Sequence, residues 1–353
     1  MVKQRRVRTP VLLALALALF LVLPAACTRT PAPEGFAPAS PVPLAQFTTH
    51  PATDRAPCWS PDGRWLAFSS DRSGDLDIWI VPAEGGPARQ VTRTPQVDDY
   101  VPRWSPDGTH ISFNSGPLLG ELRRMPAAGG PSVLLADGRG VDSRWGAAWS
   151  PDGRWLAYVA ARGVWKIPAA GGTPLPVTTG ELAAAGYSEF SGPSWSADGR
   201  AIAFGCALGG RAHVWTVPAS GGAPSQVTVA PGDGMWMSWS PDGRRLAFAA
   251  VVDGDWDIWT VPAAGGLAER LTAGPGVEVQ PDWSPDGRRI VYTRRGDIWG
   301  IPAAGGSPVC LLDTPEGKSS PRWSPDGSSM VSVNWVVTSD IWIADLGGPP
   351  APP

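Results

Sequence analysis

The stretch WSPDGRWLAF, residues 59–68, decides the fold because the chain repeats it. The same pattern starts again at six later tryptophans: Trp104, Trp149, Trp195, Trp239, Trp283 and Trp323. Successive starting points lie 45, 45, 46, 44, 44 and 40 residues apart. A fixed period of this length indicates an array of similar structural units, each too small to bury its own apolar face.

Each unit contains four short segments rich in Val, Ile, Phe and Trp and separated by Gly and Pro, a pattern typical of β-strands. In the first unit, one segment ends at Trp59, and the others cover residues 65–70, 77–82 and 88–92. No stretch of useful length has helical periodicity. Four strands in about 45 residues are typical of a propeller blade. The sequence therefore predicts an all-β, seven-bladed β-propeller with four-stranded antiparallel blades.

The Ser-Pro-Asp-Gly segment predicts a tight turn between the first two strands. Proline fixes φ at the second turn position, aspartate can accept local backbone hydrogen bonds, and glycine takes the left-handed conformation. A second set of tryptophans stands in the third strand of six units: Trp79, Trp165, Trp215, Trp259, Trp299 and Trp342. Large rings at fixed places suit blade-on-blade packing. The second unit has Leu122 and Arg123 there, so we expect residues 98–136 to form the least well packed blade.

The last unit lacks a fourth strand, and the missing piece lies at the other end of the propeller. Residues 44–49, LAQFTT, are similar to the fourth segments of the other units. We expect this N-terminal strand to complete the last blade. Such a closure would hide two open sheet edges and join the ends of the chain.

The repeated pattern PxWSPDGxxLAF…DIWxVPAxGG resembles the blades of TolB-type periplasmic proteins and covers residues 44–346. It differs from true WD repeats, because no unit has their Gly-His and Trp-Asp pairing. The resemblance implies an envelope location and protein binding, although a fold alone does not fix a function. Some related propellers are accompanied by an α/β-hydrolase domain, but the GxSxG signature of such a domain does not occur in this sequence.

The first 26 residues are typical of a signal peptide, with Lys3, Arg5, Arg6 and Arg8 before the apolar run 11–23. The run ends in LPAAC, which predicts lipidation of Cys27; cleavage after Ala26 or a retained anchor are the alternatives. Residues 27–43 are expected to form a Pro/Ala-rich linker and residues 347–353 a disordered tail. We therefore expect an exported, periplasmic or extracytoplasmic monomer that contacts membrane only through its lipid.

Charge and cysteine content exclude several classes of function. Without the first 26 residues the chain has 25 Lys and Arg against 32 Asp and Glu, a net charge of −7. An acidic surface disfavours nucleic acid as a partner. Beyond Cys27 only Cys58, Cys206 and Cys310 remain, with no CxxC, so neither a disulfide framework nor a zinc site is expected. At most one pair could form a disulfide, and the sequence does not show which.

The candidate binding surface follows from which loops vary. The two turns of one face, Ser-Pro-Asp-Gly and Pro-Ala-Ala-Gly-Gly, are nearly constant, whereas the loops of the other face differ between units. Acidic and aromatic residues recur on that variable face just before each first strand, and we expect them to surround the channel mouth. The predicted site consists of Asp54, Asp99, Tyr100, Asp142, Trp145, Glu189, Phe190, Asp233, Trp236 and Glu278. Such a site would bind an envelope protein or a cationic peptide segment. The alternative is that these carboxylates are solvated and cap turns.

Catalysis and metal binding have weaker support in the sequence. The three histidines, His50, His110 and His213, fall at different places in different units, unlike the histidine-rich channel sites of some related lyases. Carboxylates cluster in 71–77 and 253–257, which leaves calcium open as an alternative. The loop 180–192 is either a contact arm or a plain insertion. We expect a non-catalytic protein-binding scaffold without cofactor; the alternative is a metal-dependent or carbohydrate-active propeller.

Overall fold

The computed structural model describes residues 44–346 except 117–119, 138–145, 179, 210, 229–233, 275, 314–316 and 335–339. The predicted signal peptide, linker and tail, together with the lipidation site Cys27, lie outside the described residues. Among the described residues, no helix is both long and apolar enough to span a membrane.

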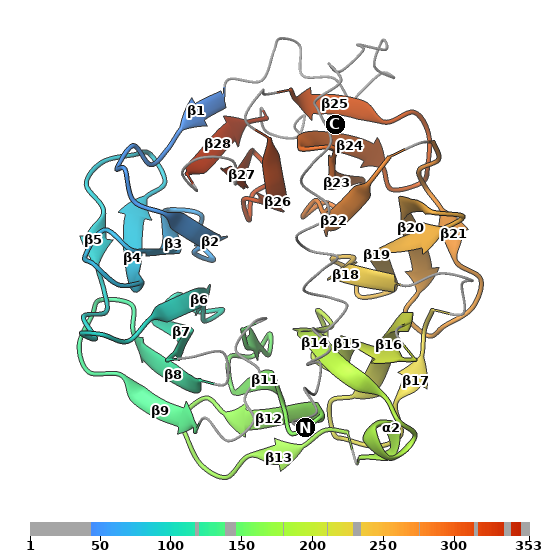
Figure 1. The fold of residues 1–353 in the computed structure, drawn as a ribbon, viewed down its shortest axis with the longest axis horizontal. Coiled ribbons are helices and arrows are strands. Elements are labelled where there is room, and N and C mark those ends of the chain that lie inside the picture. The colour runs from blue at the N-terminus through green and yellow to red at the C-terminus, as the bar shows by residue number, and fades with distance from the viewer. Residues whose placement is uncertain are drawn as a thin grey trace, which may run out of the picture.

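Seven four-stranded antiparallel sheets surround a central channel as the blades of a propeller, which confirms the predicted fold class (Figure 1). The innermost strands are β2 (Asp54–Trp59), β6 (Asp99–Trp104), β10 (Ala148–Trp149), β14 (Ser188–Trp195), β18 (Gly234–Trp239), β22 (Glu278–Trp283) and β26 (Lys318–Trp323). The second strands are β3 (Trp65–Ser70), β7 (His110–Ser115), β11 (Trp155–Ala160), β15 (Ala201–Leu208), β19 (Arg245–Val252), β23 (Arg289–Arg294) and β27 (Ser329–Asn334).

The outer half of each blade begins with the third strand. These strands are β4 (Asp77–Pro82), β8 (Glu121–Pro126), β12 (Gly163–Pro168), β16 (Arg211–Pro218), β20 (Asp255–Pro262), β24 (Asp297–Pro302) and β28 (Ile341–Asp345). The short outermost strands are β5 (Arg89–Gln90), β9 (Val133–Ala136), β13 (Leu175–Pro176), β17 (Ser225–Gln226), β21 (Glu269–Arg270) and β25 (Val309–Leu312). One short helix, α2 (Glu181–Ala184), precedes β14.

The strand β1 (Leu44–Gln46) occupies the outermost position of the last blade, so the sheet order there is β1-β28-β27-β26. Ala45 pairs with Ile343, and the Thr48 hydroxyl accepts a hydrogen bond from the Ile341 N–H at 3.0 Å. Thr178 accepts the equivalent bond from Val164 in the third blade. The N-terminal segment therefore reproduces the chemistry of an ordinary fourth strand, and the predicted closure is confirmed.

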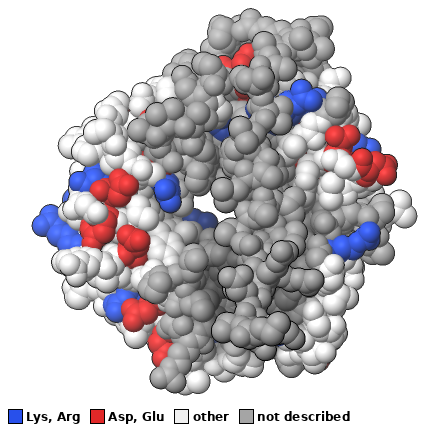
Figure 2. Space-filling model, viewed as in Figure 1, with Lys and Arg blue, Asp and Glu red and all other residues white. Residues whose placement is uncertain are grey.

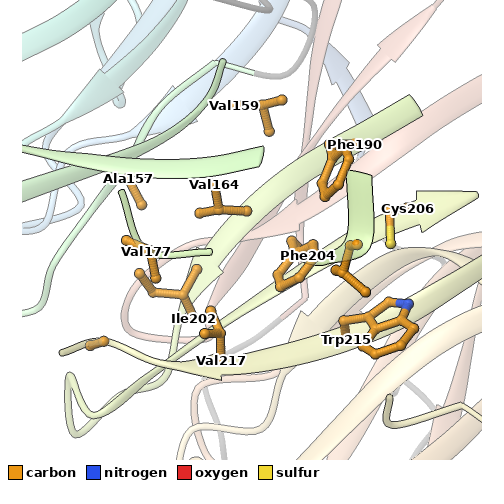
Figure 3. Packing of buried hydrophobic residues seen from close by; sticks show 12 residues of the cluster. Ala157, Val159, Val164, Val177, Phe190, Ile202, Phe204, Cys206, Trp215 and Val217 are labelled. Atoms are coloured by element: carbon orange, nitrogen blue, oxygen red, sulfur yellow. The ribbon is translucent and has the colours of Figure 1, made fainter. Parts of the chain in front are cut away.

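The hydrophobic core lies between the blades rather than at one centre. Consecutive residues of a strand point to opposite faces of its sheet, so Leu66 packs toward the last blade while Ala67 packs toward the second. Seven buried clusters fill the seven blade interfaces. In the interface between the third and fourth blades, Val164 and Val177 face Phe204 and Trp215 (Figure 3).

The second blade, expected to be the least well packed, keeps a continuous interior. Leu122 and Ile111 are fully buried, and Arg123 bonds to Glu121 at 2.7 Å and to Ser132 at 3.0 Å. The irregularity lies at its outer edge, where the side chains of Val133 and Leu134 are exposed.

The six Ser-Pro-Asp-Gly turns and the Ser-Ala-Asp-Gly turn at residues 196–199 have one hydrogen-bond pattern. In each, the serine hydroxyl donates to the aspartate at 2.5–2.6 Å. In the third blade, the Asp152 carboxylate also accepts from the Arg154 N–H, and the Ser150 hydroxyl accepts from the Trp155 N–H. The serine bond is the main cause that lowers the pKa of Asp152. The repeated aspartate therefore builds a turn, and its carboxylate is already occupied.

Candidate site in the central channel

The innermost strands form the channel wall, and each begins at the variable loop face and ends at the turn face. Figure 2 shows an opening through the middle of the molecule, with basic side chains at its border. Whatever enters this opening meets the side chains of β2, β6, β10, β14, β18, β22 and β26. Those predicted site residues that the structure describes lie among the first three residues of these strands.

Three of the predicted acidic residues are buried inside the blades and do not present charge at the channel mouth. The Arg72 guanidinium donates to both oxygens of Asp54 at 2.9 and 3.0 Å, and it lies over the Trp79 ring. Asp54 itself is completely buried. Asp54 therefore does not add an exposed negative charge to the channel mouth, because Arg72, which follows the second strand, neutralises it.

Glu278 and Asp99 have similarly enclosed positions. Glu278 pairs with Arg294 at 3.2 Å, and the Arg294 guanidinium lies over the Trp299 ring, as in the first blade. Asp99 accepts a hydrogen bond from the Thr94 hydroxyl at 3.0 Å. Burial raises the pKa of both carboxyl groups. In the last blade Lys318 takes the corresponding position, and its ammonium lies 4.0 Å from the centre of the Trp342 ring.

The remaining predicted residues divide into three groups. Tyr100 and Trp236 are half-buried on the innermost strands β6 and β18. Phe190 is buried and stacks on Phe204. Asp142, Trp145 and Asp233 lie outside the described residues, and the side chain of Glu189 is not described.

The loop 180–192 folds against its own blade. It contains α2, whose Leu182 is buried, and Tyr187 makes an edge-on contact with Trp215 at 5.3 Å between ring centres.

Every innermost strand deviates from regular geometry three residues before its repeat tryptophan. The residues at this position have positive φ between 49° and 71°: Ala56, Val101, Gly146, Gly192, Trp236, Gln280 and Ser320. Six of these strands also show a register shift at that point, which marks a β-bulge. Only two of the seven are glycine, so five ordinary side chains adopt a conformation that costs them about 1–2 kcal/mol each.

The residue immediately before each repeat tryptophan forms a second ring near the turn face. These seven residues, which we call the channel ring, are Cys58, Arg103, Ala148, Ser194, Ser238, Asp282 and Arg322. The tryptophans fix the ring, because the Trp59, Trp149, Trp195 and Trp239 indoles donate to backbone carbonyls of ring residues in the preceding blade. The flanking Trp-Ser-Pro-Asp-Gly hardly changes, yet the ring residue ranges from alanine to arginine.

Polar contacts connect the channel ring across successive blades. One carboxylate oxygen of Asp282 pairs with the Arg322 guanidinium at 3.1 Å and accepts a hydrogen bond from the Ser238 hydroxyl at 3.4 Å. The other oxygen accepts from the Trp323 backbone N–H. Burial raises the pKa of Asp282, although the adjacent Arg322 acts in the opposite direction.

On the far side of Arg322 the ring continues through Cys58 to Arg103. The Cys58 thiol contacts the Pro102 carbonyl at 3.1 Å, and burial raises its pKa to about 11, so it is not a nucleophilic thiolate at neutral pH. The sequence prediction overlooked this ring because it sought function only in the variable loops. The sequence feature that could have revealed the ring is the single variable position just before each repeat tryptophan, next to an otherwise constant motif.

Metal and calcium sites receive no support from the described residues, among which no three His, Cys, Asp or Glu side chains form a group able to hold an ion. One carboxylate of each Asp-rich loop is held by side chains of its own blade. Asp77 accepts from Ser73 and Gln90 at 2.6 and 2.8 Å, and Asp257 pairs with Arg270 at 2.5 Å. These bonds account for both loops as parts of the blade structure.

Comparison with known proteins shows which proteins the repeats are similar to. Residues 192–348 match the family model described as the TolB beta propeller domain. The Tol-Pal system protein TolB of Syntrophus aciditrophicus (strain SB) is 44% identical over 48 residues, which are 14% of this chain and 11% of that protein. The uncharacterized peptidase YuxL of Bacillus subtilis (strain 168) is 58% identical over 40 residues, which are 11% of this chain and 6% of that protein. Each match thus spans only a small part of the relative's length.

The propeller also resembles enzymes in overall shape. The crystal structure of an oligogalacturonate lyase from Vibrio parahaemolyticus superposes with a TM-score of 0.69, covering 86% of this chain and 93% of that one. The two sequences are 14% identical over this superposition, so the likeness shows the fold alone.

Proposed function

We propose that this chain, a seven-bladed propeller built of TolB-type repeats, is a non-catalytic binding protein of the bacterial cell envelope that holds a segment of a partner protein in its channel. The observation that carries the proposal is the channel wall. A nearly constant scaffold presents side chains there that differ from blade to blade, as recognition of a single asymmetric ligand requires. The TolB-type repeats and the signal-like N-terminus support an extracytoplasmic location, with Cys27 as the lipid anchor.

The segment would enter at the loop face, where Tyr100 and Trp236 are the partly exposed aromatic residues in the described part of the predicted mouth. Aromatic side chains with one open face are frequent anchors of protein interfaces. A preference of this mouth for a cationic segment would depend on Asp142, Glu189 and Asp233, since Asp54, Asp99 and Glu278 are buried. The opposite end of the channel has a different charge, because Arg103 and Arg322 lie there.

A photocrosslinking amino acid in place of Tyr100 tests the proposal in intact cells. We expect a discrete adduct with an envelope protein, and we expect it to weaken when Asp142 and Asp233 are both replaced by Asn. The control places the same crosslinker at Arg200, an exposed turn-face position. No adduct from position 100, or the same adduct from both positions, would contradict binding through the loop-face mouth.

The competing possibility is a metal-dependent or carbohydrate-active propeller, which the fold shared with the lyase suggests. Assays of oligogalacturonate cleavage and peptide hydrolysis, each with and without added divalent metal, separate it from the binding role. Turnover that survives repurification and disappears on a channel-ring substitution would replace our proposal by an enzymatic one.

A further inference from the structure

The channel ring has an unbalanced charge. Five consecutive positions, contributed by the fifth, sixth, seventh, first and second blades, hold Ser238, Asp282, Arg322, Cys58 and Arg103. The ring therefore has two arginines but a single carboxylate, which pairs with Arg322 alone. Asp282 contacts Arg322 through one guanidinium nitrogen, and this arginine side chain stays 51% exposed.

Arg103 has no carboxylate partner among the described residues. Its guanidinium donates to the Pro102 carbonyl at 2.9 Å, which is a neutral acceptor. Burial lowers the pKa of Arg103, and the nearby positive charge of Arg322 lowers it further. Because arginine stays protonated in proteins, two cations separated by one blade on the ring influence each other, and the Arg103 cation is desolvated without a carboxylate partner in the described part of the chain. An anion between them would remove this cost and gain charge-assisted hydrogen bonds.

The other two ring positions leave the arginines without a competitor. Ala148 and Ser194, from the third and fourth blades, have short uncharged side chains. No ring position has an aromatic residue, and the neighbouring tryptophan indoles are directed into the blade interfaces. The ring therefore offers cationic hydrogen-bond donors but no exposed aromatic face.

We propose that Arg103 and Arg322 bind the carboxylate of an acidic residue in a peptide segment that passes through the channel. This inference rests on the proposed protein-binding function and adds the chemistry of its ligand at the turn-face end. The planar guanidinium matches a carboxylate in two-point geometry. Asp282 orients Arg322 from one side and competes with the ligand for it. The inference therefore predicts opposite effects for neutralising the arginines and neutralising Asp282.

Fluorescence anisotropy with a labelled peptide of alternating Glu and Gly tests the site directly. We expect replacement of Arg103 and Arg322 by Gln to raise the Kd at least roughly tenfold, because charge-assisted hydrogen bonds are lost. Asp282→Asn, which keeps an oxygen acceptor, should lower the Kd. Binding to the unaltered protein should weaken with added salt. Peptides with Gln or Lys in place of Glu should bind at least roughly tenfold more weakly, because they lack the carboxylate.

The matched control is the pair Arg154→Gln and Arg200→Gln, two exposed turn-face arginines that change the net charge equally. An equal loss of affinity in this control would overturn the inference in favour of general electrostatic attraction. So would binding of oligogalacturonate, but not of the Glu peptide, through the two channel arginines. Thermal unfolding of each variant checks that the propeller is intact.

The same arginine variant in the crosslinking experiment separates the two proposals. If the adduct from position 100 persists at full yield in the Arg103→Gln, Arg322→Gln protein, the partner is captured without the arginines and only the further inference fails. If the labelled peptide binds through the arginines but no cellular adduct forms, the proposed function fails and the anion site stands.

Discussion

At the scale of single residues, seven copies of one aspartate have a structural role that their repetition already indicated. Each carboxylate accepts a serine hydroxyl within its turn, and in six turns this bond is the largest cause of the lowered aspartate pKa. For Asp286 burial is the largest influence, but the hydrogen bonds outweigh it. A site for chemistry would differ between copies, and these do not.

Replacing Ser150 by Ala tests this role. The hydroxyl that donates to Asp152 at 2.6 Å and accepts from Trp155 is lost, so we expect unfolding free energy at neutral pH to fall by about 1–2 kcal/mol. An aspartate whose pKa is lower in the folded than in the unfolded protein stabilises the fold at any pH above its unfolded pKa. That contribution is lost as the pH falls through its folded pKa. The variant should therefore lose less stability on acidification below about pH 4 than the unaltered protein.

Urea unfolding across a pH series measures both effects. Ser307→Ala, at an exposed position with no hydrogen bond recorded for its hydroxyl, is the control and should change neither quantity. If the Ser150→Ala and unaltered proteins lost the same unfolding free energy on acidification, the serine hydrogen bond would not stabilise the charged form of Asp152.

At the scale of elements, the left-handed residues of two neighbouring blades approach each other closely at Gly146. Gly146 has φ of 71°, and a Cβ added there would lie 2.6 Å from the Val101 side chain of the preceding bulge. One left-handed residue thus packs against the next, and the close approach of Val101 requires glycine at position 146.

Gly146→Ala should therefore destabilise the propeller by about 2–4 kcal/mol, from left-handed strain and overpacking together. Truncating the neighbour in the double variant Val101→Ala, Gly146→Ala should recover the overpacking part but not the strain. Denaturant unfolding of both single variants and the double variant gives the coupling between the two positions. Strict additivity would mean that residues 101 and 146 do not touch.

The sequence predicted the strands well and the partners of their charges poorly. Strand positions, turn types and the role of residues 44–49 followed from local patterns repeated seven times. The pairing of Asp54 with Arg72 depends on how two strands align, and the proximity of Arg103 to Arg322 depends on closure of the whole ring. Neither is visible in a local pattern, so the sequence placed Asp54, Asp99 and Glu278 at an open mouth when they are buried.

At the scale of the whole molecule, two kinds of contact join the last blade to the first. The Trp59 indole donates to the Arg322 carbonyl at 3.3 Å, and Phe47, just after β1, packs with Leu66 and Ile341. Removing the strand that closes the last blade exposes its edge and part of this interface.

Deleting residues 44–49 should lower the Tm by roughly 10 °C or more, because several kcal/mol of packing and hydrogen bonding are lost. Thr48→Val is the milder test, since it removes only the acceptor for the buried Ile341 N–H and should cost about 1–3 kcal/mol. Thr178→Val, the same change in the third blade, is the matched control and should cost a similar amount. Calorimetry gives both values; an unchanged Tm after the deletion would refute closure by this strand.

The bulges have one more consequence, for how the channel can hold a ligand. Seven strand edges that have no partner among the described residues line the passage, and a straight edge of that kind readily accepts an additional strand. A left-handed residue within each edge, or just before it in the third blade, breaks the regular alternation of N–H and C=O groups that such a ladder needs. The passage therefore resists β-augmentation, and a polypeptide inside it must be held by side chains rather than by main-chain pairing.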